Sequence, residues 1–371
     1  MATCPESKVI PCQTFPKIKV KRKSYVCAPL CYNAPSMKGG GKMAYAAAAD
    51  RYANGMEYRR CGRSGVRLSA FSLGFWHNFG DVSDFNVAKA VMERAFDRGI
   101  VSFDLANNYG PPYGSAERNF GKLMDLSFRP HRDEMFIATK AGYDMWDGPY
   151  GNWGSRKYLM ASLDQSLARM RLDYVDVFYS HRFDPETPLE ETLQALVDIV
   201  RQGKALYAGI SRYPADATAF AVDYLRTHDV PCLCYQGRVN LLDRAGAAPD
   251  GILAQAAAAG LGFTGFSPLA EGLLTDRYLK GIPAGSRMAR REHLTEAMRT
   301  PETLARVARL NDIAASRGET LAQMALAWTL RRPGMTSVIL GPSSVAQLDE
   351  NLKALGAAPF SEEQLDAIEK A

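Results

Sequence analysis

Eight short apolar runs, separated by stretches of helical periodicity, restrict the possible folds of this chain more than any other feature of its sequence. Most of the runs are nearly continuous in their apolar character, which is typical of strands buried on both faces. Strands that alternate with helices form parallel sheets covered by helices. The runs are Leu68 to Gly74, Ile100 to Asp104, Met135 to Thr139, Val175 to Ser180, Ala205 to Ser211, Pro231 to Gln236, Gly260 to Ser267 and Ser337 to Gly341.

Two architectures fit this alternation, a closed (β/α)8 TIM barrel and an open doubly wound sheet. The number of runs favours the α/β barrel. An open dinucleotide-binding sheet carries a GxGxxG turn after its first strand, and the sequence from Leu73 to Trp76 reads LGFW at that point. We therefore predict a barrel that is preceded by a β-hairpin over residues 56–68, with long loops over residues 142–154 and 271–300 at the carboxyl ends of its strands.

The basic charge of the chain is concentrated in its first 43 residues. This segment contains eight of the 45 Lys and Arg residues and one of the 40 Asp and Glu residues, which leaves 37 basic and 39 acidic groups for the rest. We predict two parts, a basic tail over residues 1–43 and a single barrel domain over residues 44–371. The tail is expected to be disordered, and a transit peptide or a working start near Met43 are the alternatives.

The composition of the predicted domain argues against two classes of partner. Its near-neutral charge gives no reason to expect nucleic-acid binding, although the basic tail could by itself attract nucleic acid or a membrane surface. No apolar run approaches the roughly 18 residues of a membrane span. The three scattered cysteines of the domain, Cys61, Cys232 and Cys234, indicate a reducing compartment, and we expect a cytoplasmic protein. The oligomeric state is left open, and a homo-oligomer is compatible with the sequence.

Four chemically useful side chains follow successive predicted strands. Asp104 ends one run and Tyr109 follows it in a polar turn, Lys140 ends the next run, and His181 ends the one after that. Barrel enzymes keep their chemistry at such strand ends. Tyrosine has a pKa near 10 and needs a neighbouring cation to act as an acid near neutral pH, so Lys140 is expected to lower the pKa of Tyr109. The pattern predicts proton transfer by Tyr109, without a metal ion.

The sequence segments around these residues resemble those of the aldo-keto reductase superfamily, from about Met56 to the carboxyl terminus. They include NNYGPPYGSAERNFG, DYVDVFYSHR, FSPLAEGLLTDRYLKGIP and VILGPSSVAQLDENL. Within the superfamily the chain looks most similar to bacterial L-glyceraldehyde 3-phosphate reductases, and the potassium-channel β subunits look like a close second branch. The resemblance implies that Asp104, Tyr109, Lys140 and His181 form a catalytic tetrad in which Tyr109 is the general acid.

The resemblance also implies a nicotinamide cofactor, NADPH or NADP, held without a Rossmann turn. Arg277 and Arg287 match the basic residues that contact the adenosine 2′-phosphate, which is the reason to expect NADPH. Pro342 and the pair Arg238-Val239 depart from the usual pattern. The implied cofactor contacts are Trp76, Asp104, Ser211, Arg212, Gln236, Ser267, Pro268, Leu269, Gly272, Arg277, Arg287, Gly341, Ser343, Gln347, Glu350 and Asn351.

The predicted substrate is a small aldehyde or ketone. The aromatic loop after Lys140 offers Tyr143 and Trp146 as walls of a pocket that is completed by Trp76, Tyr109 and His181. The resemblance implies L-glyceraldehyde 3-phosphate and methylglyoxal as substrates. The alternative function is a redox-sensing regulatory subunit, like the channel β subunits, that keeps the cofactor site but acts by binding a membrane protein.

Overall fold

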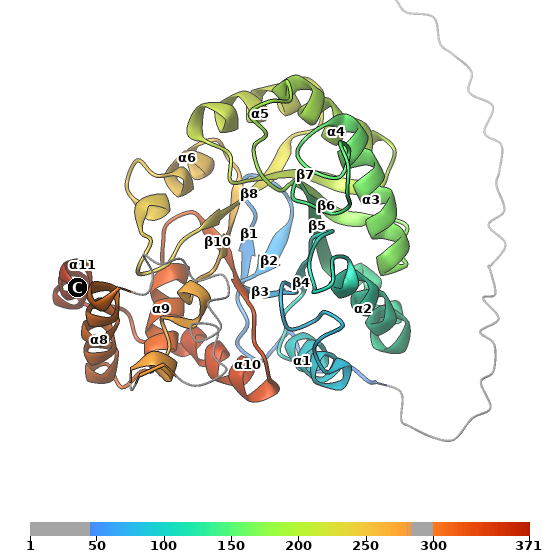
Figure 1. Cartoon of the computed structure of the whole chain (residues 1–371). Coiled ribbons are helices and arrows are strands. Elements are labelled where there is room, and N and C mark those ends of the chain that lie inside the picture. Colours follow the sequence, from blue (N-terminus) through green and yellow to red (C-terminus); the bar gives the residue numbers. More distant parts are fainter. Residues whose placement is uncertain (1–44, 280, 283–299) are drawn as a thin grey trace, which may run out of the picture. The chain divides into compact units, whose positions relative to one another are not determined.

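The parallel strands close into a barrel, as the sequence predicts. The computed structural model describes residues 45–279, 281–282 and 300–371. Strand β10 pairs with both β9 and β3, which closes the sheet and excludes the open alternative (Figure 1). The barrel strands are β3 (Phe71–Gly74), β4 (Ser102–Asp104), β5 (Phe136–Ala141), β6 (Val175–Ser180), β7 (Ala205–Ser211), β8 (Cys232–Arg238), β9 (Gly262–Phe266) and β10 (Met335–Leu340).

The predicted hairpin lies at the amino-terminal end of the barrel. Strands β1 (Tyr58–Arg60) and β2 (Arg67–Ser69) pair antiparallel, and β2 leads directly into β3. The hairpin turn approaches the barrel closely, because a Cβ atom at Gly62 would lie 2.1 Å from the carbonyl oxygen of Gly260. The φ of Gly62 is 56°, so this contact also needs a residue that tolerates the left-handed region. The hairpin thereby leaves the opposite end of the barrel free for a site.

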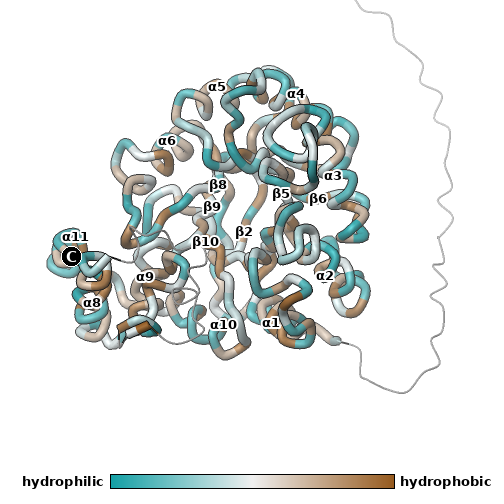
Figure 2. Tube along the Cα trace, viewed as in Figure 1, coloured by the Kyte–Doolittle hydropathy of each residue, from teal (hydrophilic) through white to brown (hydrophobic). Residues whose placement is uncertain are grey.

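A ring of helices covers the outside of the barrel (Figure 1). In Figure 2 these helices alternate between hydrophobic and hydrophilic segments along their turns, as expected for helices with one buried face. Helix α8 packs on α9, and α11 packs on α8. The helices are α1 (Phe85–Asp97), α2 (Ser115–Leu123), α3 (Arg156–Met170), α4 (Leu189–Arg201), α5 (Ala215–Thr227), α6 (Ile252–Ala258), α8 (Pro301–Ser316), α9 (Leu321–Leu330), α10 (Val345–Leu352) and α11 (Glu362–Lys370).

The sequence pattern from Thr187 to Glu190 predicts a helix that is capped by Thr187, and this detail is wrong. Helix α4 begins at Leu189, and its capping position is Pro188, which has no side-chain cap. The hydroxyl of Thr187 instead donates to Asp184 Oδ2 at 2.6 Å. The carboxylate of Asp184 also accepts from the backbone of Gly154 and so anchors the end of the aromatic loop. The hydroxyl that would have capped the helix is therefore bonded within the loop that precedes the helix.

Two expectations concern parts of the chain that the structure does not fully describe. The basic tail over residues 1–43 lies outside the described residues, and so does Arg287 in the second long loop. Across the described ranges, the helices are all too short or too polar to cross a membrane. Cys61, Cys232 and Cys234 are buried free thiols.

Candidate active site

Three of the four predicted catalytic side chains are linked through Lys140 at the carboxyl ends of β4 and β5. Lys140 Nζ lies 2.8 Å from Asp104 Oδ2 and 3.3 Å from the hydroxyl of Tyr109. It also donates to the carbonyl of Leu105 at 2.6 Å. The ammonium group thus has all three of its donors engaged and a fixed position. Asp104 is held in turn by Gln236, whose Nε2 donates to Asp104 Oδ1 at 2.8 Å.

The fourth side chain, His181, directly follows β6 and faces the same space. Its ring lies edge-on to Tyr109, with 5.9 Å between centroids, and edge-on to Tyr143, at 4.7 Å. Burial lowers the pKa of His181 well below 6.5, and the charges of Lys140 and Arg212 lower it further. His181 is therefore neutral at physiological pH. Its Nδ1 is buried and accepts no hydrogen bond from the described part of the chain.

The pKa of Tyr109 differs from the expectation. Burial raises it well above 10, the charge of Asp104 raises it further, and Arg212 opposes both. The expected lowering of this pKa is not seen, because the desolvation of the phenolate outweighs the opposing charge of Arg212. Tyr109 therefore carries its proton at neutral pH, as a proton donor must.

A buried ion pair contacts the strand that carries Lys140. Glu117 on α2 is fully buried and pairs with Arg169 on α3, where the Nε to Oε2 distance is 2.7 Å. Its other oxygen accepts from the hydroxyl of Thr139 at 2.5 Å, and Thr139 directly precedes Lys140 in β5. Glu117 thus ties two helices of the ring to the strand that carries Lys140.

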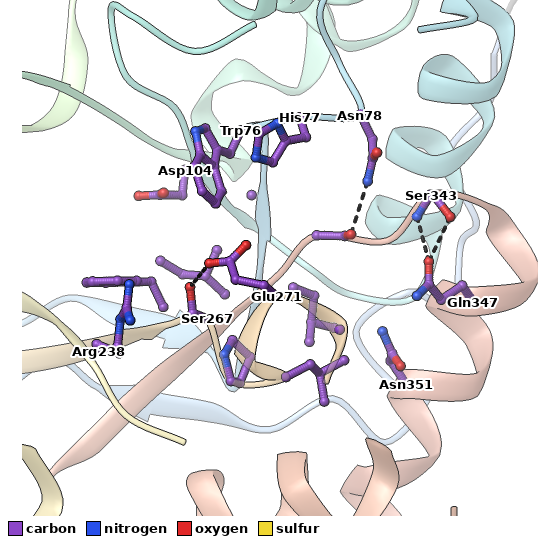
Figure 3. Close-up of a pocket in the computed structure, with 18 of the residues that line it drawn as sticks. Trp76, His77, Asn78, Asp104, Arg238, Ser267, Glu271, Ser343, Gln347 and Asn351 are labelled. Atoms are coloured by element: carbon purple, nitrogen blue, oxygen red, sulfur yellow. Dashed lines mark hydrogen bonds between the residues drawn. The ribbon is translucent and has the colours of Figure 1, made fainter. Parts of the chain in front are cut away.

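One cavity of about 670 Å³ opens at this end of the barrel, and most of the predicted site residues line it. It runs from the tetrad to α10 and the loop before it, and Figure 3 shows part of its lining. The predicted residues in its wall are Trp76, Asp104, Tyr109, Tyr143, His181, Ser211, Arg212, Gln236, Ser267, Pro268, Leu269, Gly272, Arg277, Gly341, Ser343, Gln347, Glu350 and Asn351.

Two of the predicted residues lie elsewhere. Lys140 is completely buried beneath the cavity, where it contacts Tyr109 instead of the cavity itself. Trp146 was predicted to wall the substrate pocket, and this prediction is wrong. Its ring packs on Tyr158 with 5.1 Å between centroids, because the aromatic loop folds back over α3 and only its first aromatic residue, Tyr143, reaches the cavity.

The end of the cavity remote from the tetrad is tied together by side-chain amides. Gln347 Oε1 accepts from the backbone nitrogen of Ser343 at 2.7 Å and from its hydroxyl at 2.9 Å (Figure 3). Asn78 Nδ2 donates to the carbonyls of Gly341 and Pro342, each at 3.1 Å. The loops after β3 and β10 are thereby held together, although Pro342 supplies no backbone donor of its own.

Sequence reasoning missed several lining residues. His77, Asn78 and Asn108 lie in the loops that carry Trp76 and Tyr109, so proximity to a predicted residue was an available signal. Phe266 directly precedes Ser267, and Arg238, which was named only as a departure from the family pattern, ends β8 two residues after Gln236. Since alternate residues of a strand share one face, the position of Gln236 could have predicted that Arg238 also faces the cavity.

The shape and the donors of the cavity fit a dinucleotide cofactor. The cavity is long, has the tetrad at one end, and offers amides, hydroxyls and Arg277 along the rest of its length. The hydroxyl of Ser211 is buried in its wall and has no hydrogen-bond partner in the described part of the chain. An unsatisfied buried hydroxyl at such a position is suited to a ligand group.

The fold and the site together define a class of protein, a TIM-barrel oxidoreductase. Residues 70–371 match the model of the aldo/keto reductase family. The chain belongs to this family. It is 51% identical over 332 residues to the L-glyceraldehyde 3-phosphate reductase of Escherichia coli K12, a match that covers 88% of this chain and 95% of the relative. It is 38% identical to a "Probable voltage-gated potassium channel subunit beta" of Oryza sativa, over 85% of this chain and 96% of that protein.

The pKa directions predict a flat pH profile for aldehyde reduction. His181 stays neutral and Tyr109 stays protonated between about pH 6 and pH 9, because the pKa of the first is lowered and that of the second is raised. The kcat/KM of reduction should therefore change less than about twofold over this range. The profile is measured with an aldehyde that carries no ionisable group, and a titration near pH 6.5 would contradict a neutral His181.

Proposed function

We propose that the protein is an NADPH-dependent reductase of small aldehydes and ketones. The observation that carries the proposal is the linked group of Asp104, Lys140 and Tyr109, with His181 beside it, at one end of a long cavity. The similarity to a reductase over almost the whole length of both chains supports it.

The tetrad residues have distinct tasks in this proposal. A bound reduced nicotinamide supplies the hydride. The hydroxyl of Tyr109 gives its proton to the substrate oxygen, and Lys140, held by Asp104, stabilises the phenolate that remains. Neutral His181 keeps one ring N–H available to donate to the same oxygen, which orients the carbonyl without adding a charge.

The residues along the cavity would hold the cofactor. Ser211 and Gln236 lie beside the tetrad and fit the carboxamide of the cofactor. The turn from Ser267 to Gly272 fits the pyrophosphate of the cofactor. Ser267, Ala270, Glu271 and Gly272 all have positive φ, so the backbone turns sharply where it lines the cavity. Gln347 and Asn351 line the remote end and fit the adenosine.

Arg277 is expected to select NADPH over NADH. It lines the cavity beyond the turn, and a guanidinium there can pair with the 2′-phosphate that only NADPH carries. Arg277→Ala should raise the KM for NADPH by about tenfold and change the KM for NADH less than twofold. The two values are measured at one aldehyde concentration, and equal losses for both cofactors would show that Arg277 does not contact the 2′-phosphate.

The substrates that we propose are L-glyceraldehyde 3-phosphate and methylglyoxal. The first is named by the Escherichia coli relative. Tyr143 and Trp76 line the same cavity as Tyr109 and His181 and would border the aldehyde. We place the reaction in the cytoplasm, where the buried free thiols would stay reduced.

Steady-state NADPH oxidation with a panel of small aldehydes tests this function. The proposal expects turnover well above about one per minute with both substrates. The relative from Oryza sativa favours a second candidate, a redox-sensing subunit of a membrane protein. Turnover below one per minute, together with slow release of NADP, would support the sensor and contradict the reductase.

A further inference from the structure

Three neighbouring strands of the barrel present two arginines and one phenylalanine to the cavity. Arg212 directly follows β7, Arg238 is the last residue of β8, and Phe266 is the last residue of β9. Arg238 and Phe266 are paired in register, and the backbone nitrogen of Arg212 donates to the carbonyl of Gln236. All three residues line the cavity wall, and Figure 3 shows the position of Arg238 near Ser267.

The two guanidinium groups lie against the same ring. The Cζ of Arg212 is 4.7 Å from the centroid of Phe266, and the Cζ of Arg238 is 5.7 Å from it. Stacking on an aromatic face fixes the plane of a guanidinium but leaves its N–H donors free. Both arginines are thus positioned by packing, and their N–H donors remain available to a ligand as far as the described residues are concerned.

Neither arginine forms a side-chain ion pair or hydrogen bond with another described residue. The neighbouring Arg182 provides a contrast, since it stacks on Tyr143 and also donates to Gly142 and Asn152. Two carboxylates of the cavity wall are engaged elsewhere, Asp104 by Lys140 and Glu350 by Gln323 and Lys353. Glu271 and Asp276 also line the cavity, and Glu271 Oε1 accepts from the hydroxyl of Ser267 at 3.1 Å. Two cations that face one space repel each other, which an anionic ligand would relieve.

We propose that Arg212 and Arg238 form a binding site for a phosphate group of the ligand in this cavity. This proposal rests on the proposed function and deepens it. Planar guanidinium groups bind phosphate oxygens in pairs, which makes arginine well suited to this group. The phosphate belongs either to a phosphorylated aldehyde or to the pyrophosphate of the cofactor, and both sources offer the same chemistry.

Features on both sides of the pair correspond to these two sources. Arg212 lies 5.9 Å from the ring centroid of Tyr143, which contacts His181, and its charge lowers the pKa of both Tyr109 and His181. It is therefore near the reacting end. Arg238 lies toward the Ser267 turn, which the amide of Asn240 fixes by donating to the carbonyl of Ser267 at 3.0 Å.

The test uses Arg212→Met, Arg238→Met and the double variant. Methionine keeps an unbranched apolar stem against Phe266 and removes the charge. Arg226→Met is the matched control, since Arg226 is an exposed arginine on α5 that pairs with Asp223 outside the cavity. Substrates are L-glyceraldehyde 3-phosphate and L-glyceraldehyde, which differ only in the phosphate. Calorimetry measures the Kd values of NADPH, NADH and inorganic pyrophosphate.

Two results support the site and identify its source. The ratio of the KM for the phosphorylated aldehyde to the KM for the free aldehyde is compared with that of the unmodified protein. A rise of about tenfold or more in this ratio would show that the two arginines bind the phosphate of the substrate. A similar rise in the Kd values of NADPH, NADH and inorganic pyrophosphate, with the KM ratio unchanged, would show that the arginines bind the pyrophosphate of the cofactor.

Changes below twofold in all of these values, relative to Arg226→Met, would overturn the proposal. The thermal midpoint of each variant shows that it is folded. If the unmodified protein reduced neither aldehyde, the proposed function would fail, and the calorimetric Kd values would still decide whether the two arginines bind phosphate.

Discussion

Tyr109→Phe is expected to lower the kcat of aldehyde reduction by about 10²- to 10⁴-fold, the usual contribution of a positioned general acid. The hydroxyl of Tyr109 lies 3.3 Å from Lys140 Nζ at the end of the cavity, and its raised pKa keeps the proton in place until it is transferred. The substitution removes one oxygen atom and keeps the ring beside His181. Stopped-flow or steady-state oxidation of NADPH measures the loss.

Cofactor binding provides the control for this variant. The Kd of NADPH should change less than about threefold, because the phenol contacts Lys140 and none of the residues at the remote end of the cavity. A Tyr109→Phe protein with near-normal turnover would show that another group supplies the proton. A large rise in the Kd of NADPH would instead indicate that the substitution disturbs the cavity.

Glu117→Leu is expected to destabilise the protein by about 3–5 kcal/mol, because it leaves the largely buried guanidinium of Arg169 without its partner. The hydroxyl of Thr139 loses its acceptor at the same time. The expected result in thermal unfolding is a Tm lower by roughly 4–7 °C. The conservative variant Glu117→Gln keeps an oxygen for Thr139, so its stability should fall less than that of Glu117→Leu.

The double variant Glu117→Leu/Arg169→Leu separates the two causes. If the unpaired charge is responsible, removing both charges should recover much of the lost stability, since an apolar pair of similar volume can replace a buried ion pair. If the double variant loses as much free energy of unfolding as the two single variants together, packing around α2 and α3 matters more than the unpaired charge.

The site could be predicted in part because its residues sit at strand ends. Asp104, Lys140 and His181 each end an apolar run, and parallel strands bring such ends to one side of a barrel. Trp146 could not be placed in this way, because it belongs to a loop whose path depends on contacts with α3 and Asp184. The position of an irregular loop depends on packing that no short-range pattern contains.

The pKa of Tyr109 could likewise be predicted only in part from the sequence. The sequence indicates a cation near the phenol, and the structure confirms that Lys140 is 3.3 Å away. The direction of the shift depends on how far both groups are removed from water, which is a property of the assembled barrel. The partners of Arg212 and Arg238 likewise depend on which strand ends become neighbours.

The sequence by itself determined the barrel and the residue types of its site, because apolar runs, helical spacing and strand-end side chains are local and repeat along the chain. Only the tertiary structure decided that Glu117 supports Lys140 from a distant helix, that Trp146 packs away from the cavity, and that two arginines share Phe266. These features join residues far apart in the chain, and their free energies depend on burial and distance, which exist only once the barrel has closed.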